Sequence, residues 1–179
     1  GSKLYTQRQL QKKYFDNFRF TIDDIYSALD EFDRHSVELQ QYLHENIVKQ
    51  YGRVTDLIYY DVTNYYFEID LEDELRKRGA CKEKRHDPIV QMGLAVDSQS
   101  IPISYRIYPG NTHDSETYLT QMAALKKKFN AKRIVVVADK GLNCGDNIAF
   151  NLALGDGYIF GQSVRSGSAE LKQWVLNES

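Results

Sequence analysis

The chain has 179 residues, of which 27% are charged and 42% are hydrophobic, and its formal net charge is −2 at pH 7. This is the composition of a globular domain, and the length allows a proper core. No stretch has the apolar length of a membrane span, and Cys81 and Cys144 are too isolated to form a disulfide framework or a zinc site, which predicts a reducing, cytoplasmic setting. The net charge neither indicates nor excludes nucleic-acid binding, because local patches and bound cations matter more than the total.

The N-terminal part predicts two helices. Thr21 and Asp24 have the spacing of a capping box, and apolar residues follow at helical intervals. A second helix is predicted from Ser36 to a stop at Gly52. Neither helix carries recognisable chemistry, so residues 3–53 are interpreted as a helical segment that leads into a larger domain.

The stretch LIYYDVTNYYFE, residues 57–68, predicts a strand in the middle of an α/β sheet, covered on both faces. Asp61 interrupts its apolar run. The stretch RIVVVAD, residues 133–139, repeats the design and delivers Asp139 directly after a second apolar strand. A charge at such a place is costly unless a hydrogen bond, a partner or a metal compensates it.

Acidic and basic residues at i,i+4 spacing between Asp70 and Gly79 predict a solvated helix. The pairs are Glu72–Arg76, Asp73–Lys77 and Glu74–Arg78. The further predicted elements are an antiparallel hairpin (89–97 and 101–108), a helix (114–129), the strand that ends at Asp139, a helix (145–154) and a short strand (157–161). This order predicts a mixed five-stranded α/β sheet flanked by helices.

Asp61 and Asp139 follow the two most apolar strands, so both side chains are expected to face one cation. Carboxylate oxygens are the ligands that Mg²⁺ prefers, and one or two of them often suffice beside phosphate oxygens. The sequence has no zinc-type Cys/His spacing and no glycine-rich phosphate loop after a strand. The pair of acids therefore predicts a site for a hard divalent cation.

Four stretches resemble the catalytic domain of bacterial insertion-sequence transposases of the DDE type. They read YYDVTNYYFE (59–68), DPIVQMGLAVD (87–97), IPISYRIYPGNTHD (101–114) and VVVADKGLN (135–143). The resemblance implies a ribonuclease H-like fold over residues 54–179. It also implies DNA cleavage and strand transfer with Mg²⁺, for which Mn²⁺ substitutes, and two ions in the full-length enzyme. Asp61 matches the first acid of the family and Asp139 the second.

One departure from the family pattern matters. The third acid of the family is a Glu on a later helix, in a motif with Tyr, Arg and Lys. Nothing in residues 164–179 matches that motif, and Glu170 and Glu178 are the late glutamates. The expectation is a fragment cut before the third acid, inactive alone, from a parent that acts as an oligomer on transposon ends and target DNA and has no membrane partner.

Basic residues near the acids are candidate contacts to DNA. Lys82, Lys84 and Arg85 have few acidic neighbours in sequence and are predicted to bind phosphates. Lys140, next to Asp139, either neutralises a phosphate or pairs with that aspartate.

Two other functions stay open at this point. One is a non-catalytic α/β module that binds DNA or a protein, with purely structural acids. The other is a hydrolytic nuclease of the same fold, which uses the same acids and differs only in its nucleophile. Metal binding that depends on Asp61 separates the first alternative from an enzyme.

Overall fold

The structure, a computed structural model, describes residues 2–13, 19–79, 86–129 and 133–177. The chain divides into two compact units, Gly1–Asn46 and Ile47–Ser179. None of the helices in the described part of the chain has the length and hydrophobicity that a membrane crossing requires.

The first unit is helical. Helix α1 spans Lys3–Lys13, α2 spans Ile22–Arg34, and α3 spans Ser36–Tyr51, ending in the second unit. The predicted capping box is present, since the Thr21 backbone N–H donates to Asp24 Oδ2 at 2.7 Å and the Asp24 N–H donates to Thr21 Oγ1 at 3.2 Å. Neither α2 nor α3 has a fully buried residue.

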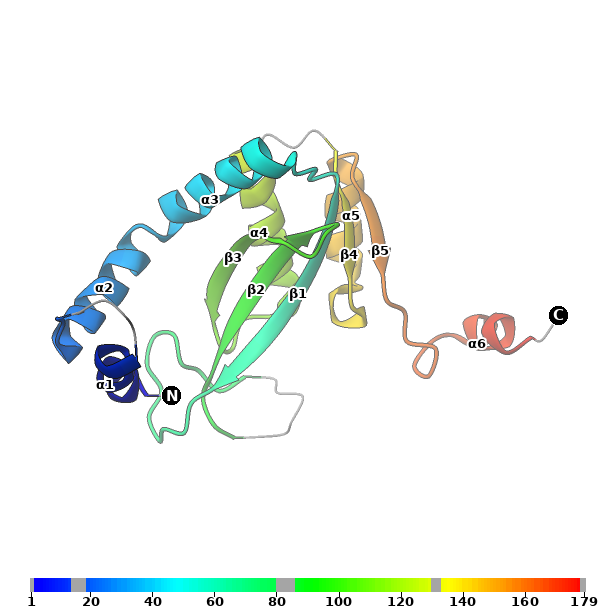
Figure 1. Cartoon of the computed structure of the whole chain (residues 1–179). Coiled ribbons are helices and arrows are strands. Elements are labelled where there is room, and N and C mark those ends of the chain that lie inside the picture. Colours follow the sequence, from blue (N-terminus) through cyan, green and yellow to red (C-terminus); the bar gives the residue numbers. More distant parts are fainter. Residues whose placement is uncertain (1, 14–18, 80–85, 130–132, 178–179) are drawn as a thin grey trace. The chain divides into compact units, whose positions relative to one another are not determined.

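The second unit is built on one mixed sheet (Figure 1). Its strands are β1 (Leu57–Tyr66), β2 (Ile89–Asp97), β3 (Pro102–Pro109), β4 (Val135–Ala138) and β5 (Gly157–Phe160). The strand order is β3-β2-β1-β4-β5, in which β1 pairs antiparallel with β2 and parallel with β4. The predicted central place of the first strand is therefore confirmed.

Helices cover the sheet. Helix α4 (Asp114–Phe129) contacts β1, β2 and β3, and α5 (Gly145–Ala153) contacts β5. A short 3-10 helix, η1 (Lys140–Leu142), joins β4 to α5. The core lies mainly between α4 and the sheet and consists of Ile58, Tyr60, Ala95, Ile103, Tyr118, Met122, Leu125, Ile134, Val136 and Leu142.

The expectation that β1 is covered on both faces is wrong for the residues that the structure describes. Ile58 and Tyr60 are buried, whereas the alternate residues Tyr59, Asp61 and Tyr65 are exposed. Side chains of a strand alternate between the two faces, so one face of β1 packs on the core and the other meets solvent. This open face is where the first acid lies.

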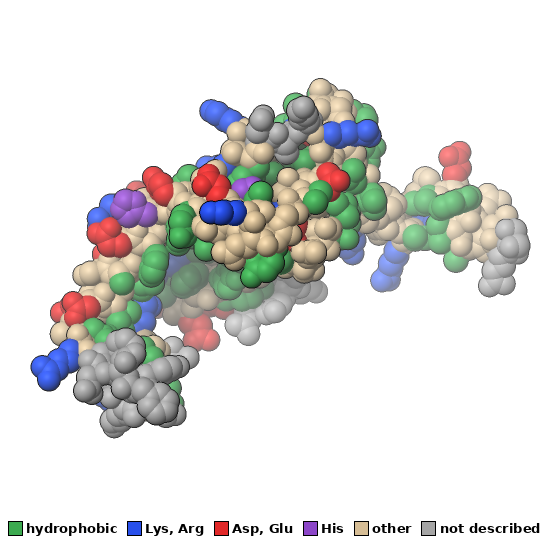
Figure 2. Space-filling view, turned by 45° about the horizontal axis from the view of Figure 1, so that its top comes forward, with side chains coloured by type: hydrophobic (Ala, Val, Ile, Leu, Met, Phe, Trp, Pro, Cys, Tyr) green, Lys and Arg blue, Asp and Glu red, His purple; other side chains and the backbone are tan. Residues whose placement is uncertain are grey.

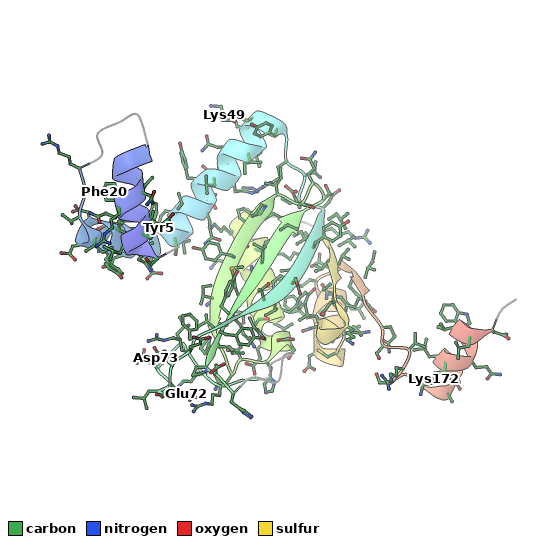
Figure 3. The ribbon with its side chains drawn as sticks, turned by 60° about the horizontal axis from the view of Figure 1, so that its bottom comes forward. Tyr5, Phe20, Lys49, Glu72, Asp73 and Lys172 are labelled. Atoms are coloured by element: carbon green, nitrogen blue, oxygen red, sulfur yellow. The ribbon has the colours of Figure 1, made fainter. Side chains whose placement is uncertain are left out.

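The predicted helix over residues 70–79 is also wrong: these residues form an extended loop (Figure 3). The Asp73 carboxylate accepts from the backbone N–H groups of Leu75 and Arg76, at 3.0 and 2.6 Å. Lys77 exchanges two backbone hydrogen bonds with Ile89. These bonds give the backbone partners other than a helical ladder, so the i,i+4 charge spacing does not decide the structure.

Helix α6 (Ala169–Leu176) has no buried residue. Its hydrophobic side chains lie at the surface, as the space-filling view shows (Figure 2), and Trp174 is 77% exposed.

Candidate active site

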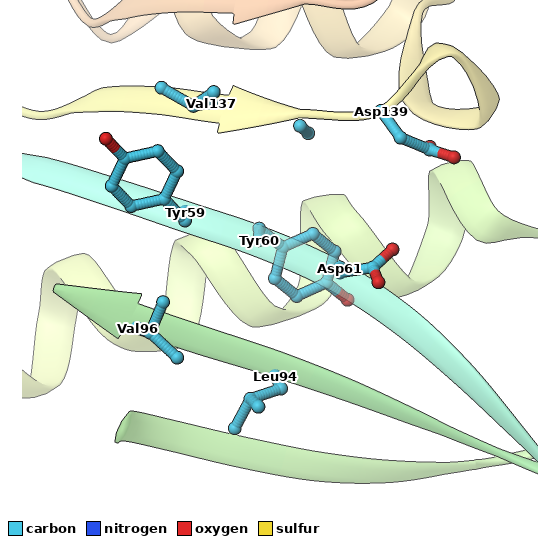
Figure 4. A pocket seen from close by; sticks show the side chains of 8 residues that line it. Tyr59, Tyr60, Asp61, Leu94, Val96, Val137 and Asp139 are labelled. Carbon is cyan, nitrogen blue, oxygen red and sulfur yellow. The ribbon is translucent and has the colours of Figure 1, made fainter. Parts of the chain in front are cut away.

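The pairing of β1 with β4 brings the two predicted acids together. The strands are parallel, and Tyr60 is the partner of Ala138 in the register. Asp61 is the next residue of β1, which continues to Tyr66, and Asp139 directly follows β4, so the two residues neighbour each other where the parallel pairing ends. Both are exposed to solvent, and Figure 4 shows the two carboxylates on the neighbouring strands.

The acids line an open cavity of about 450 Å³. The rest of its lining is largely apolar and consists of Tyr59, Tyr60, Leu94, Val96, Val137 and Ala138. The cavity thus combines two carboxylates at one end with a hydrophobic wall, which is the composition of many small-molecule and substrate sites.

Local hydrogen bonds orient Asp139. It is the N-cap of η1, and its Oδ1 accepts from the Gly141 N–H at 2.9 Å. Among the described residues, none donates a hydrogen bond to the carboxylate of Asp61, which lies on the exposed face of β1. One acid is therefore held by its own turn, while the other is presented on an open strand face.

The neighbouring Tyr60 points into the core. Its hydroxyl donates to Thr117 Oγ1 at 3.2 Å, and the Thr117 hydroxyl in turn donates to the Asp114 carbonyl at 2.7 Å. Burial raises the pKa of Tyr60, and the charges of Asp114 and Asp61 add to the effect. These bonds tie the start of α4 to the strand that carries Asp61.

Asp114, which was not among the predicted site residues, lies close to Asp139. A Cβ atom at Gly141 would lie 3.1 Å from Asp139 Oδ1 and 3.3 Å from Asp114 Oδ2, so both oxygens flank the same small space. The sequence showed Asp114 only as the start of a helix, and nothing in its spacing points to Asp139. Only the anchoring of α4 on β1 reveals the proximity.

Of the four basic residues predicted to contact DNA, the structure describes Lys140. Lys82, Lys84 and Arg85 lie outside the described residues. Lys140 lines a second cavity beside the first.

No group of three or more His, Cys, Asp and Glu side chains among the described residues is arranged to hold a metal ion. The donor set of Asp61 and Asp139 nevertheless fits a hard divalent cation. Mg²⁺ takes oxygen ligands and commonly needs only one or two protein carboxylates, with water and phosphate oxygens completing its shell.

Comparison with known families decides the assignment. Residues 34–176 match the family described as "Transposase DDE domain". The chain belongs to this family. The match includes all five strands, both acids and the helices α4 and α5, and it confirms the DDE-type resemblance of the sequence. The expected architecture of the DDE domain, a mixed five-stranded sheet flanked by helices, is confirmed as well.

Several solved transposases are similar to the chain, all at low identity. A Mos1 transposase paired-end complex with the left transposon end is 12% identical (TM-score 0.41; 87% of this chain and 49% of that chain). The catalytic domain of Mos1 mariner transposase is 15% identical (TM-score 0.39; 68% and 58%). A piggyBac transposase synaptic complex with hairpin DNA is 15% identical (TM-score 0.42; 70% and 26%). No curated protein sequence matches the chain significantly.

The chain spans between 26% and 58% of the length of these solved proteins. Since their TM-scores lie below 0.5, the likenesses carry no argument about activity. Family membership and the geometry of the two acids are therefore the observations on which a function rests.

Proposed function

We propose that the chain is part of the catalytic domain of a bacterial insertion-sequence transposase, which cleaves DNA and transfers strands with Mg²⁺, or with Mn²⁺ as a substitute. One observation carries the proposal beyond family membership: the in-register parallel pairing of β1 and β4 sets Asp61 directly beside Asp139. Carboxylates on neighbouring strands can hold the divalent ions that metal-dependent phosphoryl transfer uses.

Each residue has a distinct role in this scheme. In this scheme Asp61, on the open strand face, would be shared by two divalent ions, and Asp139 would hold one of them. Divalent ions at such a site activate the attacking oxygen and stabilise the leaving oxygen of an in-line displacement. The Gly141 N–H keeps the Asp139 carboxylate in a fixed orientation, and Lys140 offsets the charge of a DNA phosphate.

The domain division and the wider assembly belong to the same proposal. Residues 3–53 lead into the catalytic domain of residues 54–179, and the third carboxylate of the family lies outside the present sequence. The substrates are transposon ends and target DNA, bound by an oligomer of the full-length protein in the cytoplasm. Lys82, Lys84 and Arg85 remain proposed phosphate contacts.

The test of the site is metal binding. Isothermal titration with Mn²⁺ is expected to show one weak site in the 179-residue chain, lost in Asp61→Asn and in Asp139→Asn. Asp146→Asn is the matched control, because it removes the same charge from an exposed position in the first turn of α5. Equal Mn²⁺ affinity of Asp61→Asn and wild type contradicts the proposal and favours a non-catalytic module.

The chemistry needs a DNA assay. The expectation for the chain alone is no efficient cleavage of a labelled DNA end with Mg²⁺ or Mn²⁺, because the third carboxylate is missing. In the full-length protein, joining of the cleaved end to a target plasmid distinguishes strand transfer from hydrolysis. Cleavage by the 179-residue chain that Glu170→Gln abolishes shows a complete triad within these residues and overturns the placement of the third acid.

A further inference from the structure

A second cavity of about 360 Å³ begins at Lys140, the residue that follows Asp139. It lies at the carboxyl ends of the parallel strands β4 and β5, the edge where ligands bind in open α/β sheets. Its lining is polar and consists of Lys140, Gly141, Asn143, Gly161, Gln162, Ser163 and Ser166. The proposed function uses Lys140 and the backbone N–H of Gly141, but none of the other lining residues.

The turn after β4 separates the two cavities. Asp139 lines the first and Lys140, the next residue, lines the second. Gly161 allows the close packing of this turn on the end of β5, since a Cβ atom there would lie 3.0 Å from the Lys140 backbone nitrogen. The cavity is therefore one residue away from the proposed metal ligand, and its position is fixed by backbone contacts.

The chemistry of the second cavity is opposite to that of the first. Within the described residues its lining contains one lysine, four amide or hydroxyl side chains, and neither a carboxylate nor an aromatic ring. Such a set binds an anion through hydrogen bonds and charge, because Lys, Ser, Asn and Gln side chains are frequent contacts to DNA phosphates. Because the described lining contains no aromatic ring, it offers no surface on which a DNA base could stack.

Two of the polar side chains are already ordered. Asn143 Nδ2 donates to Gln162 Oε1 at 2.6 Å and to the Gly161 carbonyl at 3.1 Å. This uses the oxygen of Gln162 and leaves its NH₂ group as a donor. The Ser163 hydroxyl accepts from the Ser166 N–H at 3.4 Å, so its own proton is available to an acceptor.

We propose that this second cavity is a phosphate-binding subsite, which holds a phosphodiester of the DNA strand next to the one at Asp61 and Asp139. The inference rests on the proposed function. Lys140 supplies the charge, while Gln162 and Ser163 supply neutral donors. The subsite fixes the position of the strand without reading its sequence, because backbone contacts carry no base information.

The test is binding of single-stranded oligonucleotides in EDTA, which removes the metal from the measurement. The affinity of two oligonucleotides of unrelated sequence is measured by fluorescence anisotropy over a range of salt concentrations. Gln162→Glu is the decisive variant: it preserves an oxygen acceptor for Asn143 but replaces a donor by a negative charge. We expect it to lower both affinities about tenfold at low salt, and Gln162→Ala with Ser163→Ala to lower them about fivefold.

Lys140→Gln is expected to lower the slope of log affinity against log salt by about 0.7, the contribution of one phosphate contact on a single strand. The matched control is Ser98→Ala with Gln99→Ala, an exposed Ser–Gln pair in the β2–β3 turn, which lies beyond the amino end of β1. The control is expected to bind like wild type.

Wild-type affinity of Gln162→Glu overturns the subsite, and so does an effect confined to one of the two sequences. Failure of the wild type to bind either oligonucleotide at low salt also overturns it. The proposed function is judged separately by Mn²⁺ titration of Asp61→Asn. If Asp61→Asn loses Mn²⁺ binding but Gln162→Glu does not change the affinity for DNA, the proposed active site is supported and the subsite is overturned.

Discussion

A buried ion pair joins the segment before β1 to the β2–β3 turn. Arg53 Nε donates to Asp97 Oδ2 at 2.8 Å, and the two side chains are only 1% and 3% exposed. Arg53 also donates to the Pro102 carbonyl at 2.8 Å. The other carboxylate oxygen, Asp97 Oδ1, accepts from the N–H groups of Gln99 and Ile101 at 3.0 and 2.9 Å. One aspartate thus holds both the turn and the arginine.

Asp97→Asn tests the energetic weight of this pair. The amide oxygen is able to keep both turn hydrogen bonds, so the substitution removes mainly the charge and leaves a buried guanidinium without its counterion. Breaking a buried pair in this way costs about 3–5 kcal/mol. A domain of this kind is stable by about 5–15 kcal/mol in total, so the loss is a large fraction.

Urea denaturation followed by circular dichroism measures the change in unfolding free energy, with the slope m as a check on two-state behaviour. Asp73→Asn serves as the control, because its partner Arg76 lies on an exposed loop and both side chains are 41% exposed. We expect a much smaller effect there, since solvent screens exposed pairs. A loss below about 1 kcal/mol in Asp97→Asn, with m unchanged, refutes the reasoning.

Three further substitutions probe the core and the site. Gly93→Ala places a Cβ atom 2.3 Å from the Tyr60 hydroxyl oxygen, and we expect a loss of about 1–3 kcal/mol in urea denaturation; unchanged stability contradicts the packing. Gly141→Ala places a Cβ atom 3.1 Å from Asp139 Oδ1 and 3.3 Å from Asp114 Oδ2, so the affinity for Mn²⁺ should fall roughly tenfold with little change in stability. Wild-type Mn²⁺ affinity of this variant in titration contradicts the role of the Gly141 turn in orienting Asp139. Burial raises the pKa of Tyr118 from 10.0 to about 12, so its contribution to stability is complete below pH 10 and is lost as pH rises toward 12. Tyr118→Phe should therefore lose stability less steeply than wild type over this range, and parallel curves in alkaline denaturation would refute the assignment.

Local patterns predicted most of the secondary structure. The capping box at Thr21 and Asp24 and the helical apolar spacing after it give α2, and the strand pair around Asp97 gives the hairpin β2–β3. Such signals lie within a few residues of one another, so the sequence alone contains them. The helix predicted around Asp73 was wrong because it rested on a local charge pattern alone. Lys77 pairs with Ile89, a contact that a local pattern does not reveal.

The site was predictable only in part. Each acid is visible as a charge after an apolar strand, which indicated Asp61 and Asp139. Their register, the approach of Asp114 and the cavity beside Lys140 depend on how α4 and β5 pack against the sheet. These contacts join residues far apart in the chain, and no spacing rule connects them.

The position of β1 has a consequence for the order in which the strands of the sheet can pair during synthesis. Its antiparallel partner β2 follows soon after it in the chain, so this side of the sheet is available to form early during synthesis. The parallel partner β4 comes much later, and Asp139 cannot join Asp61 until the ribosome has released it. A chain synthesised only as far as β3 contains three strands of the sheet and Asp61, but it lacks the second acid.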